Sequence, residues 1–415
     1  MIKTQSKSHE ISGTDYLGTD ELFLTEDERT VRDACRDFVA KEILPHIMEW
    51  DKGNTAPFGD AEALIRNTAR NLAATTGVFG AYMNGIEKYL GPDFTPITPA
   101  GYGVAMRELE YGDTALRSLA SVQSSLCMFA ILEYGSEAQK KKWLPELFAG
   151  RKLACFGLTE AQGGSDPSVM LTTAKKTAAG WILNGTKVWI TNGFADVAVV
   201  WAKTDEGIRG FLVERDTPGY SFRNEEKWAL RAGIASSLSM SNCEVPADNL
   251  LPGTVQPAGG SDLKSPLRCL NEARYGICWG AIGAMRACIK EVTDYSHKRI
   301  LFGKPLAYKQ ETQRKLAKMV SETECAQLLA LRLSDLKAKG ALNHVHVSMG
   351  KYNNICKAVE VAQLACELLP ADVFTFDAYH SGRHMRNMHV VKKYEGTHEI
   401  HTLIIGRAIT GVPAF

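Results

Sequence analysis

The stretch that decides the fold is GWILNGTKVWITNG (Gly180–Gly193), because it breaks the periodicity of the chain around it. β-Branched and aromatic residues alternate here with polar ones, and this two-residue period is typical of strands. Runs of the same kind, such as VAVVWAKT and GIRGFLVERD, recur between residues 152 and 262 with Gly, Asn, Asp and Pro between them. We expect antiparallel strands there, with a hairpin turn at Asn184 and Gly185.

On both sides of this zone, apolar residues recur at the three- and four-residue steps of a helix. The long runs in the last third of the chain predict an antiparallel bundle. The expected fold class is therefore α+β and mostly α. Its expected parts are a mobile tail over 1–24, an N-terminal helical domain over 25–151, a middle antiparallel β domain over 152–262 and a C-terminal four-helix bundle domain over 263–415.

The charge balance excludes several classes of partner. Among 415 residues, 48 Lys and Arg face 47 Asp and Glu, for a net charge of +1. This balance predicts neither nucleic-acid binding nor stable membrane insertion, and no apolar run approaches the length of about 18 residues that a membrane-spanning helix needs. The ten cysteines show no CxxC spacing and are expected to be reduced in a cytoplasmic protein.

A buried arginine is expected in ELEYGDTALRSLASVQSS. Gly112 and Asp113 predict the end of one helix and the N-cap of the next. Arg117 and Ser121, four residues apart, then share one helix face whose other residues are mostly small or apolar. An arginine there needs a partner, and Glu110 is the candidate. Two interpretations stay open: an internal salt bridge, or a guanidinium held by Glu110 and offered to a ligand carboxylate.

Two stretches of the middle zone have the composition of a ligand-binding surface. In CFGLTEAQGGSDPS, Gly163 and Gly164 allow close approach of the backbone and Ser165 can donate a hydrogen bond, although an ordinary strand-ending turn explains the stretch equally well. In VWITNG, Trp189 and Thr191 lie on one strand face and can line a flat, heteroatom-rich ring, while core packing is the commoner role of such a pair.

The segment YEGTHEIHT near the end of the chain raises three possibilities: a metal site, an ordinary helix start or a catalytic base. His398 and His401 are three residues apart and do not form an HExxH motif, so no metal is expected. Glu395 precedes the helical run, and Gly396 after it lets a substrate approach the backbone.

In their order and spacing, the segments FGLTE…GSD, LNGTKVWITNG, RILFGKPLAYKQ and YEGTHEIHTLIIGRAITG resemble the acyl-CoA dehydrogenases over nearly all of the chain from about residue 25. The resemblance implies FAD as cofactor and a homotetramer. It is strongest to the members that act on glutaryl-CoA. The implied reaction is α,β-dehydrogenation of a dicarboxylyl-CoA thioester, glutaryl-CoA to crotonyl-CoA plus CO₂, with electron-transferring flavoprotein or another acceptor taking the electrons.

The resemblance also implies residue roles. Glu395 would be the base that removes the α-proton, and Arg117 would pair with the distal carboxylate of the substrate. The residues implied to bind substrate are Glu110, Arg117, Ser118, Ser121, Ser165, Asn271, Arg274 and Gly396. Those implied to contact FAD, some across a subunit interface, are Phe156, Leu158, Thr159, Ser165, Trp189, Thr191, Arg299, Gln310, Thr397 and Phe415.

Three departures from the family pattern keep alternatives open. Where the family has a Gly-rich turn, this chain reads ELLPADVFTFDAYHSG (367–382), and where the family has a Gln it has Leu301. Both positions bear on how the adenine end of FAD is bound. The loop over 86–101 is longer than in the family and concerns acyl specificity. The alternatives are a dehydrogenase of another dicarboxylyl-CoA or of a carrier-protein-bound acyl group without decarboxylation, or a flavin-free binding paralogue.

Overall fold

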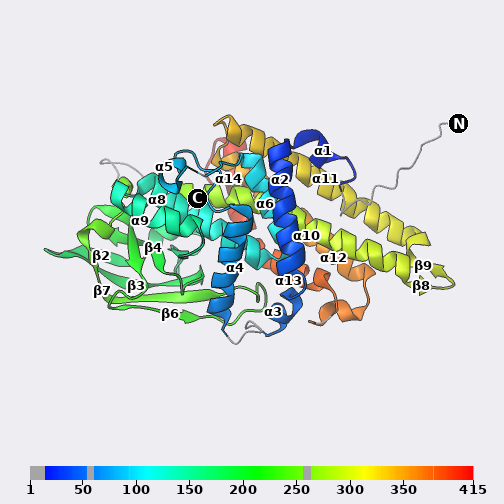
Figure 1. Ribbon diagram of the computed structural model, residues 1–415, viewed down its shortest axis with the longest axis horizontal. Helices are drawn as coiled ribbons and strands as arrows, with labels where there is room; N and C mark the ends of the chain where they lie inside the picture. The colour runs from blue at the N-terminus through cyan, green and yellow to red at the C-terminus, as the bar shows by residue number, and fades with distance from the viewer. Residues whose placement is uncertain (1–14, 54–59, 93, 256–262, 377, 415) are drawn as a thin grey trace.

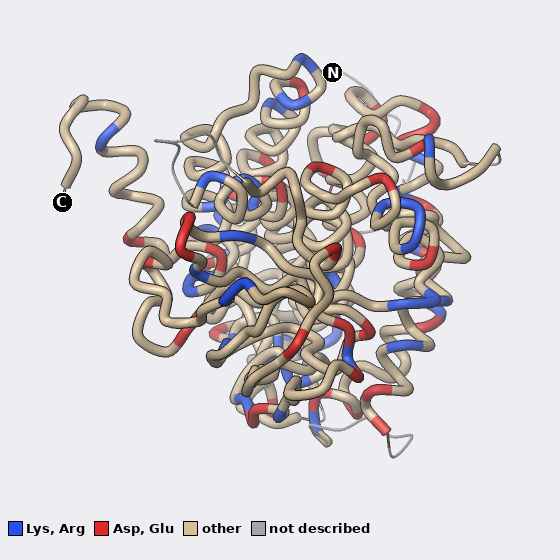
Figure 2. Tube along the Cα trace, turned by 90° about the vertical axis from the view of Figure 1, so that its left-hand side faces the viewer, with Lys and Arg blue, Asp and Glu red and all other residues tan. Residues whose placement is uncertain are grey.

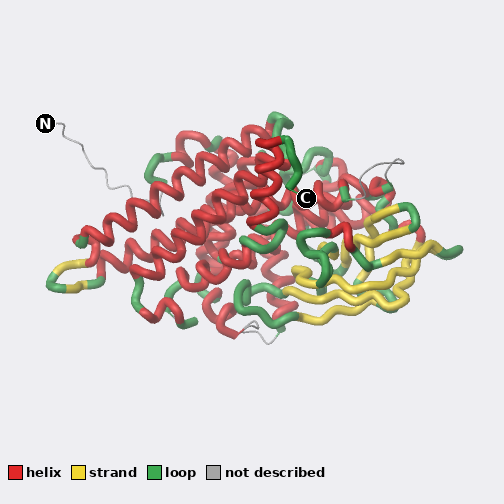
Figure 3. Tube along the Cα trace, turned by 180° about the vertical axis from the view of Figure 1, so that it is seen from behind, coloured by secondary structure: helices red, strands yellow, loops and turns green. Residues whose placement is uncertain are grey.

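The computed structural model describes residues 15–53, 60–92, 94–255, 263–376 and 378–414. The elements follow the predicted α–β–α order, which confirms the fold class. A body of long helices carries the β domain at one end (Figure 1; Figure 3). Phe415, expected to contact FAD, lies outside the described residues.

The N-terminal domain is helical, and its turn at residues 112–114 forms as predicted: Asp113 Oδ1 accepts a hydrogen bond of 2.6 Å from the Ala115 N–H and caps the next helix. Its elements are α1 (Thr19–Phe23), α2 (Glu26–Phe38), η1 (Val39–Ile43), α3 (Ile47–Gly53), α4 (Ala61–Thr76), α5 (Glu87–Leu90), α6 (Pro99–Gly112), α7 (Thr114–Ser121), η2 (Val122–Met128), α8 (Phe129–Tyr134) and α9 (Glu137–Phe148).

The expectation that no stretch is long and apolar enough to span a membrane needs correction. The continuous helix Thr114–Tyr134, formed by α7, η2 and α8, meets that length and composition, but 83% of its apolar window is buried inside the structure. Its apolar surface is thus covered by protein, as in the core helix of a globular domain.

The expectation of a mobile tail is wrong for residues 15–24. Asp20 is buried, and its two carboxylate oxygens each accept a 2.7 Å hydrogen bond from the guanidinium of Arg107 on α6. Thr19 Oγ1 donates to Glu324 of the C-terminal bundle. The physical reason is that Arg107 is fully buried, and Asp20 adds a bidentate partner to the Glu108 carboxylate that also binds its guanidinium.

The middle domain is a seven-stranded sheet with strand order β1-β4-β2-β3-β7-β6, and β5 pairs with β4. Most pairings are antiparallel as predicted, but β4 runs parallel to β1 and to β2. The strands are β1 (Ala154–Gly157), β2 (Thr173–Lys176), β3 (Gly180–Thr191), β4 (Val197–Thr204), β5 (Gly207–Glu214), β6 (Tyr220–Asn224) and β7 (Ala235–Pro246).

The predicted hairpin at Asn184 and Gly185 is wrong. Both residues lie inside β3, where the pairing with β7 shifts register next to Gly185. Gly185 has φ 149°, and a Cβ on it would lie 2.4 Å from Thr172 Oγ1. The glycine therefore allows a bulge and a close chain contact within one strand rather than a turn between two strands.

The C-terminal domain is built on long helices that pack side by side, with α14 leading away from the body to the chain end (Figure 2). Gly283 of α10 lets α6 approach so closely that an added Cβ would lie 1.9 Å from the Arg107 carbonyl oxygen. The elements are α10 (Lys264–Lys298), β8 (Ile300–Leu301), β9 (Lys304–Pro305), η6 (Leu306–Tyr308), α11 (Gln310–Ala338), α12 (His344–Leu368), α13 (His380–Val391) and α14 (His398–Thr410).

Candidate active site

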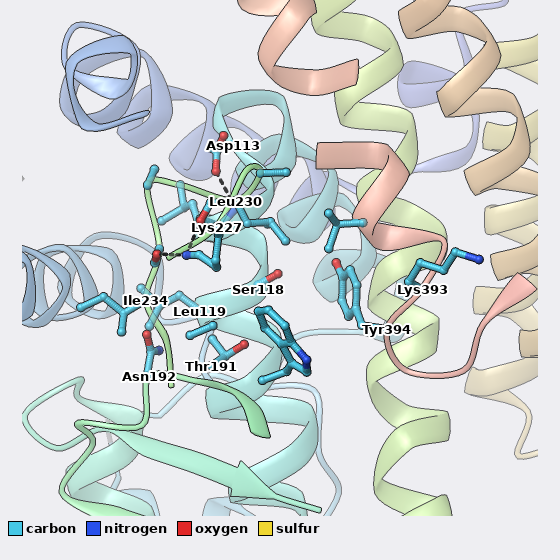
Figure 4. A pocket seen from close by; sticks show the side chains of 18 of the residues that line it. Asp113, Ser118, Leu119, Thr191, Asn192, Lys227, Leu230, Ile234, Lys393 and Tyr394 are labelled. Atoms are coloured by element: carbon cyan, nitrogen blue, oxygen red, sulfur yellow. Dashed lines mark hydrogen bonds between the residues drawn. The ribbon is translucent and has the colours of Figure 1, made fainter. Parts of the chain in front are cut away.

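A cavity of about 570 Å³ lies where the N-terminal helices, the β domain and the C-terminal bundle meet. Side chains from all three domains point into it: Ser118 from α7, Thr191 from β3 and Tyr394 from the turn before α14 (Figure 4). Eight of the predicted site residues line this one cavity: Ser118, Thr159, Ser165, Trp189, Thr191, Glu395, Gly396 and Thr397.

The other predicted site residues do not line the cavity. Three of them, Glu110, Arg117 and Ser121, are buried between the helices. Phe156 in β1 and Leu158 directly after that strand are also buried. Arg299 and Gln310 are exposed next to the β8–β9 hairpin, at the opposite end of the bundle from the β domain (Figure 1). The remaining pair, Asn271 and Arg274 on α10, lies behind the turn that carries Glu395.

Glu395 stands in the turn between α13 and α14 with a left-handed backbone, φ 53°. A non-glycine residue held in this conformation is strained, and such strain is concentrated at functional sites. Its Oε2 atom is buried and has no hydrogen-bond partner among the described residues. Burial raises the pKa of Glu395, while the positive charges of Arg117, Lys351 and Arg274 oppose that rise. These features are typical of a general base.

Two buried cations fix the backbone of this turn. Arg274 Nε donates to the Glu395 carbonyl oxygen at 2.7 Å. Lys351 Nζ donates to the carbonyl oxygens on either side, those of Tyr394 and, at 2.6 Å, of Gly396. Lys351 was not singled out from the sequence. It could have been noticed as the one lysine on a helix face whose other residues are apolar or small, because a lysine at such a position is expected to be buried and to need a partner.

Arg117 is paired on two sides and unpaired on the third. Its Nε donates to Glu110 Oε2 at 2.5 Å and its Nη2 to the Tyr394 hydroxyl, whereas its Nη1 has no partner among the described residues. Ser121 Oγ, one turn along α7, also lacks a described partner. The salt bridge with Glu110 is therefore present. Tyr394, missed in the sequence, stands between the guanidinium and the cavity.

The β-domain wall of the cavity is shaped for a flat group. Trp189 has φ 60° at a β3 bulge and 63% of its surface is exposed, and it lines the cavity together with Thr191. Thr159 and Ser165 join them from the loop after β1. An indole left bare beside hydroxyl groups on a cavity wall is typical of a ligand surface.

These residues fit the isoalloxazine ring of FAD. The cavity has the size of a cofactor pocket, its floor is an exposed indole flanked by hydroxyl donors, and a buried unpartnered carboxylate oxygen faces it. Trp189, Thr191, Thr159 and Ser165 would hold the ring from the β domain, and Thr397 from the C-terminal domain. Among the described residues, no group of three or more His, Cys, Asp or Glu could hold a metal ion.

Comparisons with known proteins agree with this geometry. Family models match in all three domains: "Acyl-CoA dehydrogenase, N-terminal domain" over residues 25–151, "middle domain" over 155–243 and "C-terminal domain" over 263–410. The human mitochondrial short-chain specific acyl-CoA dehydrogenase is 31% identical over 389 residues, covering 92% of this chain and 90% of that protein.

Solved structures give the same result at higher identity. The glutaryl-CoA dehydrogenase of Mycobacterium smegmatis is 43% identical, with a TM-score of 0.88 over 97% of this chain and 99% of the other. A structure of a glutaryl-CoA dehydrogenase from the same organism in complex with FADH₂ is 42% identical, with the same TM-score over 96% and 98% of the two chains. The chain therefore belongs to the acyl-CoA dehydrogenase family and is an FAD-dependent oxidoreductase.

Proposed function

We propose that this enzyme oxidises a dicarboxylyl-CoA thioester, with glutaryl-CoA as substrate and crotonyl-CoA and CO₂ as products. The observation that carries the proposal is the unpaired Glu395 carboxylate on the same cavity as Trp189 and Thr191, with the Arg117 guanidinium behind Tyr394. The net reaction is glutaryl-CoA, FAD and a proton giving crotonyl-CoA, CO₂ and FADH₂.

Glu395 would remove the α-proton of the thioester. A thioester α-C–H is a weak acid, and a carboxylate whose pKa is raised by burial is a stronger base than one in water. Gly396 has no side chain, so the thioester oxygen can approach the backbone beside the base. FAD, held by the cavity residues named above, would supply the hydride acceptor for Cβ. Glu395, then protonated, would return a proton to Cγ after the γ-carboxylate leaves as CO₂.

Arg117 would select for the distal carboxylate of the substrate. Its Nη1 is a charged donor in the protein interior without a hydrogen-bond partner in the described part of the chain, and a substrate carboxylate would supply one. Ser121 Oγ, on the same face of α7, is a second group that no described residue binds. A site built around such polar groups disfavours acyl chains that leave them unpaired.

We also propose, on the family resemblance, that the enzyme is a homotetramer and that electron-transferring flavoprotein or another acceptor reoxidises it. A cytoplasmic location is proposed on the unpaired cysteines alone. No membrane insertion and no nucleic-acid partner are expected.

Anaerobic titration of the purified flavoprotein with glutaryl-CoA and butyryl-CoA tests the substrate class. We expect glutaryl-CoA to bleach the flavin faster and to give crotonyl-CoA and CO₂, measured by mass spectrometry. In the Arg117→Lys variant, kcat/KM should fall about 100-fold for glutaryl-CoA and much less for butyryl-CoA, because lysine lacks the planar fork of donors. An equal fall for both thioesters would remove the proposed role of Arg117.

A second candidate is a short-chain monocarboxylyl-CoA. The specific observation is that the Tyr394 hydroxyl already binds Arg117 and separates it from the cavity. In that case butyryl-CoA would be the better substrate in the same titration. Bleaching by a dicarboxylyl thioester without release of CO₂ would instead identify a non-decarboxylating dehydrogenase. Bleaching only by an acyl group bound to a carrier protein would show that the natural substrate is carried on a protein rather than on CoA.

A further inference from the structure

We propose that Lys351 is a positioning residue for the base: its ammonium holds the turn over residues 394–396, and its charge keeps the Glu395 carboxylate ionised. This inference rests on the proposed function, in which Glu395 removes the α-proton.

The ammonium of Lys351 is buried without a bonded carboxylate among the described residues. The residue is 2% exposed, and its two hydrogen bonds go to carbonyl oxygens, those of Tyr394 and Gly396. Burial of a cation without an opposite charge is strongly unfavourable. Burial lowers the pKa of Lys351 to about 7, and the negative charge of Glu395 is the strongest influence that opposes this fall and favours the ammonium form. The two groups therefore form a charge pair that meets through the turn rather than through a direct hydrogen bond.

The turn needs such a tether because its backbone is strained. Glu395 and Gly396 are consecutive residues with positive φ, 53° and 90°. Lys351 binds the carbonyl oxygens of the 394–395 and 396–397 peptides, and Arg274 binds that of the 395–396 peptide between them, so α12 and α10 together fix the turn around the base. Release of these oxygens would let the turn relax and carry the carboxylate away from the substrate α-carbon.

The charges that act on Glu395 come from three helices. Arg117 on α7, Arg274 on α10 and Lys351 on α12 all favour the carboxylate form. His401 on α14 also lies behind the turn, but burial and neighbouring cations lower the pKa of His401 to about 3, so its ring is neutral near pH 7. Tyr394 lies within the turn, and burial raises its pKa to about 12, which keeps the phenol protonated. Loss of the Lys351 charge therefore raises the pKa of Glu395.

Two variants separate the tether from the charge. Lys351→Met removes both the charge and the donor but keeps an unbranched apolar stem, whereas Lys351→Gln keeps a donor without the charge. The control Lys357→Met removes one charge from the same helix, at a residue that pairs with Glu322 on α11. FAD content and circular dichroism establish that each variant is folded.

The measurement isolates proton removal from hydride transfer. In 3-thiaglutaryl-CoA and 3-thiabutanoyl-CoA, sulfur replaces Cβ, so the α-proton can leave but no hydride can follow. The enolate stacked on oxidised flavin absorbs at long wavelength, and this band is followed against pH by stopped flow. Whichever thioester binds more tightly serves as probe, so an error about the acyl class does not affect the test.

In both Lys351 variants we expect the midpoint of the pH profile to move to higher pH, because the carboxylate form of Glu395 loses a stabilising charge. At pH values above the midpoint, Lys351→Met should be about 10- to 100-fold slower than the wild type, and Lys351→Gln closer to it. Lys357→Met should match the wild type. If Lys351→Met does not fold, the midpoint of Lys351→Gln decides.

An unchanged midpoint in Lys351→Gln, or an unchanged midpoint and plateau rate in Lys351→Met, would overturn the inference. The Glu395→Gln variant separates this failure from a failure of the proposed function. If it still forms the band, Glu395 is not the base; if it does not, and the Lys351 variants behave as wild type, only the role of Lys351 is wrong.

Discussion

At the residue scale, the site depends on one turn in which an acid and a glycine both adopt positive φ. The sequence predicted that Glu395 and Gly396 belong together, because the glycine follows the acid directly. It could not predict how the turn is held, because the groups that bind its carbonyl oxygens come from Arg274 and Lys351, more than 40 residues away along the chain. Contacts between distant helices leave no local pattern.

A Gly396→Ala substitution tests the turn. A Cβ at this position would lie 3.0 Å from Arg274 Nη2 and 3.0 Å from His401 Nε2, at φ 90°. We expect unfolding free energy to fall by about 1–3 kcal/mol and flavin bleaching by substrate to slow at least tenfold. Gly340→Ala, between α11 and α12, is the control: its φ is 65° with nothing within 4 Å. The control variant should lose stability through backbone strain but bleach as fast as the wild type. If both variants bleached at the same rate, the turn at Gly396 would have no special role in the reaction.

At the element scale, periodicity predicted helices and strands well and chain reversals poorly. The helix stop at Gly112 and the cap at Asp113 were predictable because a cap is local chemistry. Asn184 and Gly185 look like a hairpin turn by the same local rule, yet the pairing of β3 with β7 continues past them. Tertiary pairing overrode the local preference there. Trp189 and Thr191 do line the same cavity, although a bulge, and not simple alternation, sets their direction.

The close approach of α10 and α6 gives a prediction at this scale. Gly283→Ala would place a methyl group 1.9 Å from a backbone carbonyl oxygen of α6, so the helices must separate. We expect a loss of about 2–3 kcal/mol in unfolding free energy, measured by urea denaturation. Gly406→Ala on α14, with nothing within 4 Å of the added Cβ, should leave stability nearly unchanged. A Gly283→Ala protein as stable as the wild type would contradict the packing described.

At the scale of the whole molecule, the segment over 15–24 joins domains that are distant in sequence. Composition alone gave no sign of this, because α1 is short and its contacts, among them a buried ion pair of Asp20 with Arg107 and Arg286, are made to residues far away in the sequence. Burial alone would raise the pKa of Asp20, but these guanidinium groups outweigh it and hold the pKa well below its usual range.

Asp20→Asn should therefore lower the unfolding free energy by about 3 kcal/mol at pH 7, because two buried arginines lose a carboxylate. The pKa of Asp20 is lower in the folded protein than the value of 3.8 in the unfolded chain, so its ionised carboxylate stabilises the fold at pH values above 3.8. This stabilisation is lost progressively as the pH falls below 3.8. The gap in Tm between variant and wild type should accordingly narrow in acid. The control Asp37→Asn removes an exposed pair with Lys41 and should change Tm little. A gap that stays constant down to acid pH would contradict the ion-pair account.

The most direct test of the whole account is anaerobic mixing of the purified flavoprotein, wild type and Glu395→Gln, with glutaryl-CoA while the flavin absorbance is followed. We expect the variant to keep its FAD and bind the thioester while its flavin stays oxidised, because no carboxylate is present to take the α-proton. Bleaching of the Glu395→Gln flavin at a rate near that of the wild type would contradict it.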